Sequence, residues 1–314
     1  MLRRAWRHAH GAVHRRTAHL PPTVQGLLWS ALSVTVFSGL NAIARVLAQG
    51  LESYQVQFLR YAMGLVVMLP FVWHHGVAHY KPQALRGHLA RGALHTLGLT
   101  LWFLALPRIP LADTTAIGFT TPLFVMVGAW LFFKEQMRWE RWLATVLGFV
   151  GVLIVVLPQA SLGTTGPGLY HLAMLASAPV FAASYLLTKS LTRHESTGTI
   201  LLWQQIVIAG LSLPMAVVVW QPLGAAQWAG FLACGVLGTL GHYALTRSIK
   251  VADISSTQSV KFIELVWAAL LGWVIFADLP TLHTLAGGLL IAAATVWVTR
   301  REARIGAARR PPSA

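Results

Sequence analysis

Ten apolar stretches fill most of this chain and leave few residues for a soluble domain. Seven of them carry no charged residue: 26–44, 114–133, 142–157, 168–188, 199–220, 227–246 and 281–299. Three are interrupted by charge: 55–73 by Arg60, 88–106 by Arg91, and 254–276 by Lys261 and Glu264. A helix needs roughly 20 apolar residues to cross a bilayer. Only 11% of the residues are charged, against about a quarter in a soluble domain. The sequence therefore predicts an all-α integral membrane protein with ten transmembrane helices.

The net charge of +15 does not indicate a nucleic-acid partner, because the basic residues follow the loops. If both termini are cytoplasmic, 20 of the 24 lysines and arginines lie on the cytoplasmic side. These are Arg3, Arg4, Arg7, Arg15, Arg16, Lys81, Arg86, Arg91, Lys134, Arg138, Arg141, Lys189, Arg193, Arg247, Lys250, Arg300, Arg301, Arg304, Arg309 and Arg310. The opposite loops hold at most Arg45 and Arg108. This positive-inside pattern predicts a multi-pass protein of the cell inner (plasma) membrane, with the lipid bilayer as its partner.

The chain also divides into two similar halves. Phe37 recurs 144 residues later as Phe181, and Gly92 recurs 143 residues later as Gly235. With five spans per half, the second half must enter the membrane from the opposite side, which predicts two inverted five-helix repeats. The predicted segments are a basic cytoplasmic tail at 1–25, a first repeat at 26–157, a periplasmic linker at 158–167, a second repeat at 168–299 and a basic cytoplasmic tail at 300–314.

Several short motifs occur in order along both halves. They are Gln57-Phe58-Leu59-Arg60, Thr120-Thr121-Pro122-Leu123-Phe124, Phe133-Lys134-Glu135, the run from Leu270 to Asp278, and Gly287-Gly288. With this arrangement the chain resembles the drug/metabolite transporter superfamily, specifically EamA-type transporters with two EamA repeats, over about residues 24–304. The resemblance implies export or uptake of small metabolites, usually driven by an ion gradient or by the substrate gradient. Ala277-Asp278 departs from the Gly-Glu pair of similar proteins, and Glu264 from the basic residue that many carry nearby.

The leading hypothesis is a secondary active transporter for a small organic metabolite (amino-acid-like, vitamin- or cofactor-like, or drug-like) that works by alternating access. A non-transporting membrane scaffold or receptor, and a channel, are the alternatives. Coupling to protons and assembly as a homodimer stay open. No enzyme, cofactor or metal is predicted, since the chain has no P-loop or GxSxG motif. Cys234 is the only cysteine, so an intrachain disulfide is excluded.

The charged pair in the ninth span is the first candidate for a substrate site. A charge at the centre of a membrane helix costs roughly 2.5–3.5 kcal/mol on insertion scales. Lys261 and Glu264 are three residues apart, and Gln258 lies one turn earlier, so all three would share one helix face. They would then line a central cavity in which Glu264 binds a proton or a cationic group. An internal ion pair that only holds spans together is the alternative.

Arg60 is the second candidate, near the outer end of the second span, and its repeat partner is Gln204. Its planar guanidinium suits a carboxylate or phosphate, whereas snorkelling toward the interface is the alternative. Further polar and aromatic residues within spans are candidate cavity-lining residues, although each could equally serve helix packing. They are Asn41, His95, Trp102, Tyr185 and His242, together with Gln204.

Overall fold

The computed structural model describes residues 20–48, 50–105, 117–118, 120–135, 138–156, 168–276 and 282–308. The helices of the first half are α2 (Pro22–Ala48), α3 (Ser53–His75), α4 (Leu85–Ala105), α6 (Thr121–Phe133) and α7 (Trp139–Val156). Those of the second half are α8 (Gly168–Leu191), α9 (Thr197–Val218), α10 (Ala225–Val251), α11 (Ile254–Gln258), α12 (Ile263–Phe276) and α13 (Leu282–Ala308). Two 3-10 turns, η1 (Val77–Tyr80) and η2 (Ser259–Phe262), complete the described elements. The predicted linker at 158–167 lies outside the described residues.

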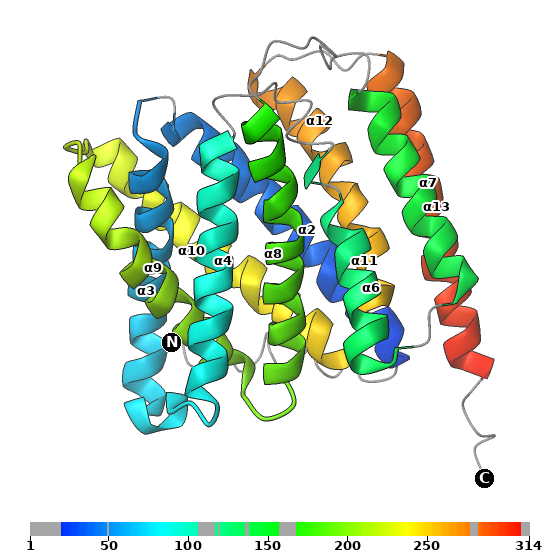
Figure 1. Ribbon diagram of the computed structural model, residues 1–314, viewed down its shortest axis with the longest axis horizontal. Helices are drawn as coiled ribbons and strands as arrows, with labels where there is room; N and C mark the ends of the chain where they lie inside the picture. The colour runs from blue at the N-terminus through cyan, green and yellow to red at the C-terminus, as the bar shows by residue number, and fades with distance from the viewer. Residues whose placement is uncertain are drawn as a thin grey trace, which may run out of the picture.

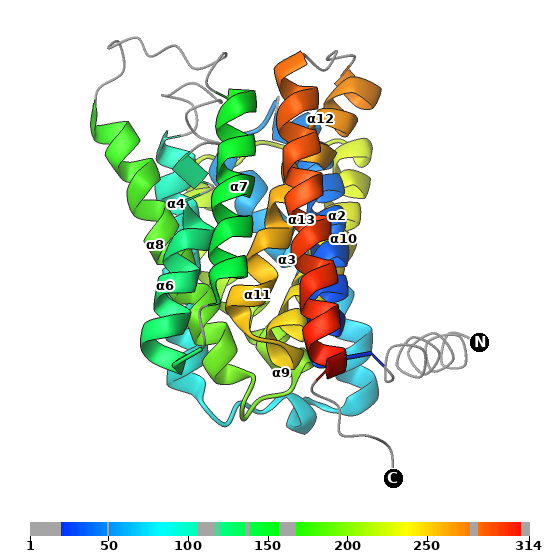
Figure 2. The ribbon, with the colours of Figure 1, turned by 90° about the vertical axis from the view of Figure 1, so that its right-hand side faces the viewer.

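The described helices run alternately up and down across the molecule, with α11, η2 and α12 together forming one crossing (Figure 1). Five helices are long and apolar enough to cross a membrane by length and composition, and α6 is a shorter apolar helix. The helix α2 begins and α13 ends at the same end of the bundle, where the connections α3–α4, α6–α7 and α8–α9 also lie (Figures 1 and 2). We call this the basic end, because it carries Lys81, Arg86, Lys134, Arg138, Arg193, Arg301 and Arg304. The ten-helix membrane fold predicted from the sequence is therefore confirmed.

The helices pack as two bundles, and each bundle takes helices from both halves. The α2 bundle consists of α2, α10, α11 and α12, with α2 lying along α10 and α12. The α8 bundle consists of α4, α6 and α8, with α8 lying along α4 and α6. Outside these two bundles, α3 packs on α9 and α7 packs on α13. The contacts are equivalent in the two halves: α2 on α10 corresponds to α8 on α4, and α2 on α12 corresponds to α8 on α6. The equivalent helices α2 and α8 run in opposite directions (Figure 1). This is the packing that an inverted repeat requires.

One pair of contacts shows the repeat at the level of single residues. A Cβ atom added to Gly241 of α10 would lie 2.9 Å from the ring of Phe37 on α2. A Cβ atom added to Gly98 of α4 would lie 2.8 Å from the ring of Phe181 on α8. Small residues let membrane helices approach closely, so each phenylalanine ring fills the space that a glycine of the other half leaves open.

Two helices differ from the expected spans. The ninth span is not one regular helix, because η2 separates α11 from α12. The tenth helix continues beyond residue 299 to Ala308, so Arg300, Arg301 and Arg304 extend from the helix rather than from an irregular tail. A broken span within a membrane protein is tolerated where its backbone lines a protein interior or a cavity.

Candidate functional site

A buried polar network joins the two bundles through α9. The guanidinium of Arg91 on α4 donates hydrogen bonds to the hydroxyl of Thr188 on α8 and, at 2.6 Å, to Oε1 of Gln204 on α9. The amide nitrogen of Gln204 lies 3.1 Å from both ring nitrogens of His242 on α10. Because hydrocarbon offers no hydrogen bonds, a buried guanidinium needs such partners within the protein. This chain of contacts therefore connects the α8 bundle to the α2 bundle.

A second arm of the network comes from α3. The hydroxyl of Tyr61 lies 3.1 Å from Nε2 of His95 on α4, and Ser184 on α8 lies 3.4 Å from Nδ1 of the same ring. The His95 ring lies edge-on to His242, with 6.0 Å between the ring centres. Both histidines are buried, so they meet at the junction of the two bundles rather than at a lipid-facing surface.

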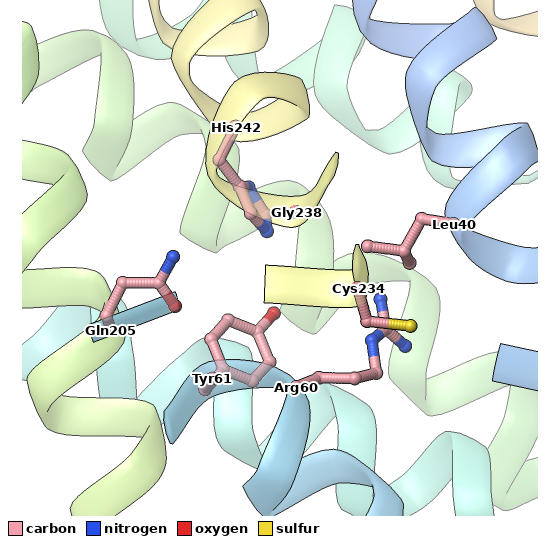
Figure 3. A pocket seen from close by; sticks show the side chains of 7 residues that line it. All are labelled: Leu40, Arg60, Tyr61, Gln205, Cys234, Gly238 and His242. Carbon is pink, nitrogen blue, oxygen red and sulfur yellow. The ribbon is translucent and has the colours of Figure 1, made fainter. Parts of the chain in front are cut away.

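A narrow cavity lies beside this network, between α2, α3, α9 and α10 (Figure 3). Its lining residues are Leu40, Arg60, Tyr61, Gln205, Cys234, Gly238 and His242. Tyr61 and His242 belong both to the network and to the cavity wall. About 210 Å³ of empty space lies among these residues, and part of it is open to solvent. This space is too narrow for a metabolite, which would need the bundles to move apart.

The charged pair of the ninth span makes contacts with two different helices. The ammonium of Lys261 on η2 lies 3.8 Å from the ring centre of Tyr185 on α8, a cation–π contact between the bundles. Glu264 in the first turn of α12 accepts a hydrogen bond of 3.2 Å from the amide of Asn41 on α2. Among the described residues, no ion pair joins Lys261 to Glu264. Each charged group therefore contacts a neighbouring helix directly, in addition to its electrostatic attraction to the other.

The structure brings most of the predicted site residues to the junction of the bundles and places Trp102 away from it. Arg60, His95, Gln204 and His242 lie in the network or the cavity, and Asn41, Tyr185, Lys261 and Glu264 form the contacts of the ninth span. Trp102 instead packs near Met174 and Tyr170, toward the end of α4. Gln258 ends α11, and its side chain is outside the described part of the structure.

Tyr61 and Gln205 are cavity residues that the sequence analysis did not single out. They are 144 residues apart and directly follow Arg60 and Gln204, which are also 144 residues apart. The register of the repeat could therefore have found them. Arg60 itself lies seven residues after the start of α3, roughly two helical turns inside the bundle and deeper than the sequence indicated.

Polar contacts also join the two bundles at the basic end. The ammonium of Lys189 on α8 donates to the carbonyl oxygens of Ile249 and Ala252, at 2.8 Å and 2.5 Å, where α10 ends. The carboxylate of Glu135, just after α6, accepts from the backbone N–H of Ile254 at 3.0 Å, where α11 begins. Both contacts satisfy backbone groups that a helix end leaves without a partner. The structure is therefore closed at the basic end.

Glu195, between α8 and α9, strengthens this closure. Its Oε1 accepts from the backbone N–H groups of Gln83 and Ala84, at 2.7 Å and 2.9 Å, at the start of α4. Its carbonyl oxygen accepts from the ammonium of Lys250 at 3.2 Å, at the end of α10. Burial raises the pKa of Glu195, but the hydrogen bonds from Ala84 and Gln83, together with the contact to His88 at 3.2 Å, hold the pKa below the ordinary value of 4.5. One carboxylate thus ties the start of α4 to the α8–α9 connection.

The alternating apolar helices and the buried polar junction between bundles define a multi-pass membrane transporter, and comparison with known proteins agrees. Residues 24–157 and 168–300 each match the EamA-like transporter family. The chain is 30% identical over 277 residues to the S-adenosylmethionine uptake transporter of Rickettsia felis, covering 88% of this chain and 93% of that protein. It is 33% identical over 287 residues to the riboflavin transporter of Rhizobium johnstonii, covering 90% and 93%.

A solved crystal structure shares the fold, with a TM-score of 0.72 and 18% identity over 89% of this chain and 98% of the other. The chain belongs to the EamA-like transporter family, with two EamA repeats, within the drug/metabolite transporters. The family resemblance predicted from the sequence is confirmed, and so is a transport function for small metabolites in place of an enzymatic one.

Replacing Glu195 by alanine should lower the free energy of unfolding by about 1–3 kcal/mol, because two N–H groups lose a charged acceptor. Since the pKa of Glu195 is lowered in the folded protein, its contribution is present above 4.5 and is lost as the pH falls through the lowered pKa. Glu195→Gln should therefore weaken the loss of stability on acidification. Thermal unfolding of the purified protein between neutral and acidic pH measures both effects.

Glu52 provides the matched control, because it precedes Glu195 by 143 residues, is exposed, and caps α3 without a side-chain hydrogen bond. Glu52→Ala should leave the unfolding temperature nearly unchanged. Equal losses from the two alanine variants would contradict a specific role for Glu195.

Proposed function

We propose that the chain is a secondary active transporter of the inner membrane, with both termini cytoplasmic, that moves a small organic metabolite by alternating access. The junction is the observation that supports this proposal, because two bundles meet there through the contacts of Arg91, Gln204 and His242. Side chains that exchange partners there would let one end close while the other opens. In this proposal the basic end is cytoplasmic, and the closed contacts of Lys189 and Glu135 form the inner gate.

The moving units would then be the two bundles, each of which takes helices from both repeats, 26–157 and 168–299. The substrate-contact residues of the proposal are Asn41, Arg60, His95, Tyr185, Gln204, His242, Gln258, Lys261 and Glu264. Trp102 is not included, because it packs toward the end of α4. Glu264 is the candidate for coupling to protons, because it is the one acidic residue that the sequence places within a span and it bonds to a neutral amide. One chain contains the whole site, so the proposal holds for a monomer and for a homodimer alike.

The relatives suggest the first substrates to test, since one is named for S-adenosylmethionine and another for riboflavin. Membrane vesicles that contain the protein should take up or release at least one of these labelled compounds faster than vesicles from the same cells without it. Collapse of the proton gradient should slow this flux if Glu264 couples transport to protons. No difference between the vesicles for either compound, or for a wider pool of labelled metabolites, would contradict the proposal.

The ninth span supplies a sharper prediction. The double variant Lys261→Met plus Glu264→Leu should insert at a normal level, because it removes both costly intramembrane charges at once. Its transport should nevertheless fall by about tenfold or more, since the contacts to Tyr185 and Asn41 are lost. Flux is measured per amount of protein in the membrane.

A second double variant, Arg138→Met plus Glu140→Leu, serves as the control. It removes the ion pair of 3.1 Å between these two residues and the ion pair of 3.3 Å between Glu140 and Arg301, both near the basic end and away from the junction, and should retain most transport. Near-normal flux in the Lys261–Glu264 double variant would show that the two charges are structural.

A further inference from the structure

Arg60 differs from Arg91, the other arginine that interrupts an apolar span of the first half. Arg91 donates to Thr188 and Gln204. Arg60 lines the cavity, and in the part of the chain that the structure describes it has neither a hydrogen-bond nor an ion-pair partner. Seven residues separate it from the start of α3, which corresponds to roughly 10 Å along the helix. Its side chain points across the cavity toward Cys234, and not along α3 toward the interface (Figure 3). Snorkelling does not describe this arrangement.

A second polar group without a partner lies in the same cavity. The amide oxygen of Gln205 on α9 is buried and accepts no hydrogen bond from the described residues. Gly64 on α3 leaves space for this side chain, because a Cβ atom added to Gly64 would lie 2.5 Å from Nε2 of Gln205. Buried acceptors are usually satisfied, so one that faces a cavity calls for a donor from outside the protein. The cavity thus presents a cation and an acceptor together.

The repeat explains why Arg60 and the amide oxygen of Gln205 have no hydrogen-bond partner among the described residues. Arg60 and Tyr61 occupy the positions that Gln204 and Gln205 occupy in the second half. The helix opposite Gln204 carries Arg91, and the two side chains bond to each other. The equivalent of Arg91, 143 residues later, is Cys234. A buried thiol behaves as a small apolar group and cannot neutralise a guanidinium. The first-half position therefore has the cation but not its partner.

We propose that Arg60 and Gln205 form the subsite for the carboxylate end of an amino-acid-type substrate. The guanidinium of Arg60 donates to both carboxylate oxygens, and the adjacent amino group donates to the amide oxygen of Gln205. When the bundles move apart, this end of the molecule would lie between Arg60 and Gln205, and the rest would lie at the junction beside Tyr61 and His242. The inference rests on the proposed transport function and narrows it: S-adenosylmethionine carries such an α-amino carboxylate, and riboflavin carries no carboxylate.

Cys234 makes the subsite directly testable, because it is the chain's only cysteine and lines the cavity with Arg60. Spheroplasts are treated with three thiol reagents: an anionic methanethiosulfonate (the ethylsulfonate), a cationic one (the ethyltrimethylammonium) and neutral methyl methanethiosulfonate. Relative to a free thiol, the anionic reagent should react with Cys234 about tenfold faster than the cationic one, because Arg60 attracts it. Arg60→Gln, which installs the residue of the repeat-equivalent position, should abolish this preference, and Arg60→Lys should retain it.

The neutral reagent reports whether each variant is folded with a reachable cysteine. An anion preference that survives Arg60→Gln would overturn the inference. Failure of every reagent to modify wild-type Cys234 would overturn it too, since the cavity would then admit no solute.

Substrate protection supplies the second readout. S-adenosylmethionine should slow the labelling of Cys234 by the neutral reagent, decarboxylated S-adenosylmethionine should not, and Arg60→Gln should remove the protection. Equal protection by both compounds, or by neither, would contradict carboxylate recognition at this site. These labelling results do not depend on flux. Charge-selective labelling without transport would support the subsite and refute the proposed function. Transport that Arg60→Gln does not affect would support the proposed function and refute the subsite.

Discussion

The hydrocarbon interior of a membrane provides no hydrogen bonds and little solvation for charge, so each polar side chain placed there must find its partner within the protein. In this chain the constraint collects the polar side chains at one place. Arg91, Gln204 and His242 bond across the junction of the bundles, and Lys261 rests on the ring of Tyr185 there. The surfaces that face lipid can then remain apolar. The requirement that keeps the fold stable in lipid also gathers these polar side chains where the two bundles meet.

The scaffold is symmetric, whereas the polar residues on it are not. Phe37 on Gly241 and Phe181 on Gly98 repeat the same packing in both halves. At the polar positions, by contrast, Arg60 stands where the second half has Gln204. Identical packing gives two bundles that can rock about a common centre. Different polar residues make the two faces of the centre unequal: Gln204 bonds to Arg91, whereas Arg60 has no hydrogen-bond partner among the described residues.

The sequence predicts the ten spans, their direction and the repeat, because lipid demands long apolar segments and the basic loops mark one side. It also identifies Arg60, Lys261 and Glu264, since charge stands out in an apolar background. It does not reveal the break at η2, because residues 254–276 are apolar enough for one helix and contain neither glycine nor proline before Gly272. Nor does it reveal partners: the i,i+3 spacing predicts one shared face, but Lys261 reaches Tyr185 and Glu264 reaches Asn41.

The central claim is that the two bundles separate at the basic end during transport. Spin labels at Thr23→Cys in the first turn of α2 and Arg86→Cys in the first turn of α4, in a Cys234→Ala background, place one probe on each bundle at that end. Pulsed electron–electron double resonance measures the distance distribution between the two spin labels in lipid nanodiscs. The account predicts one short distance without substrate and an additional, longer population when a transported metabolite is added. A single distance that stays unchanged while the metabolite demonstrably binds would contradict it.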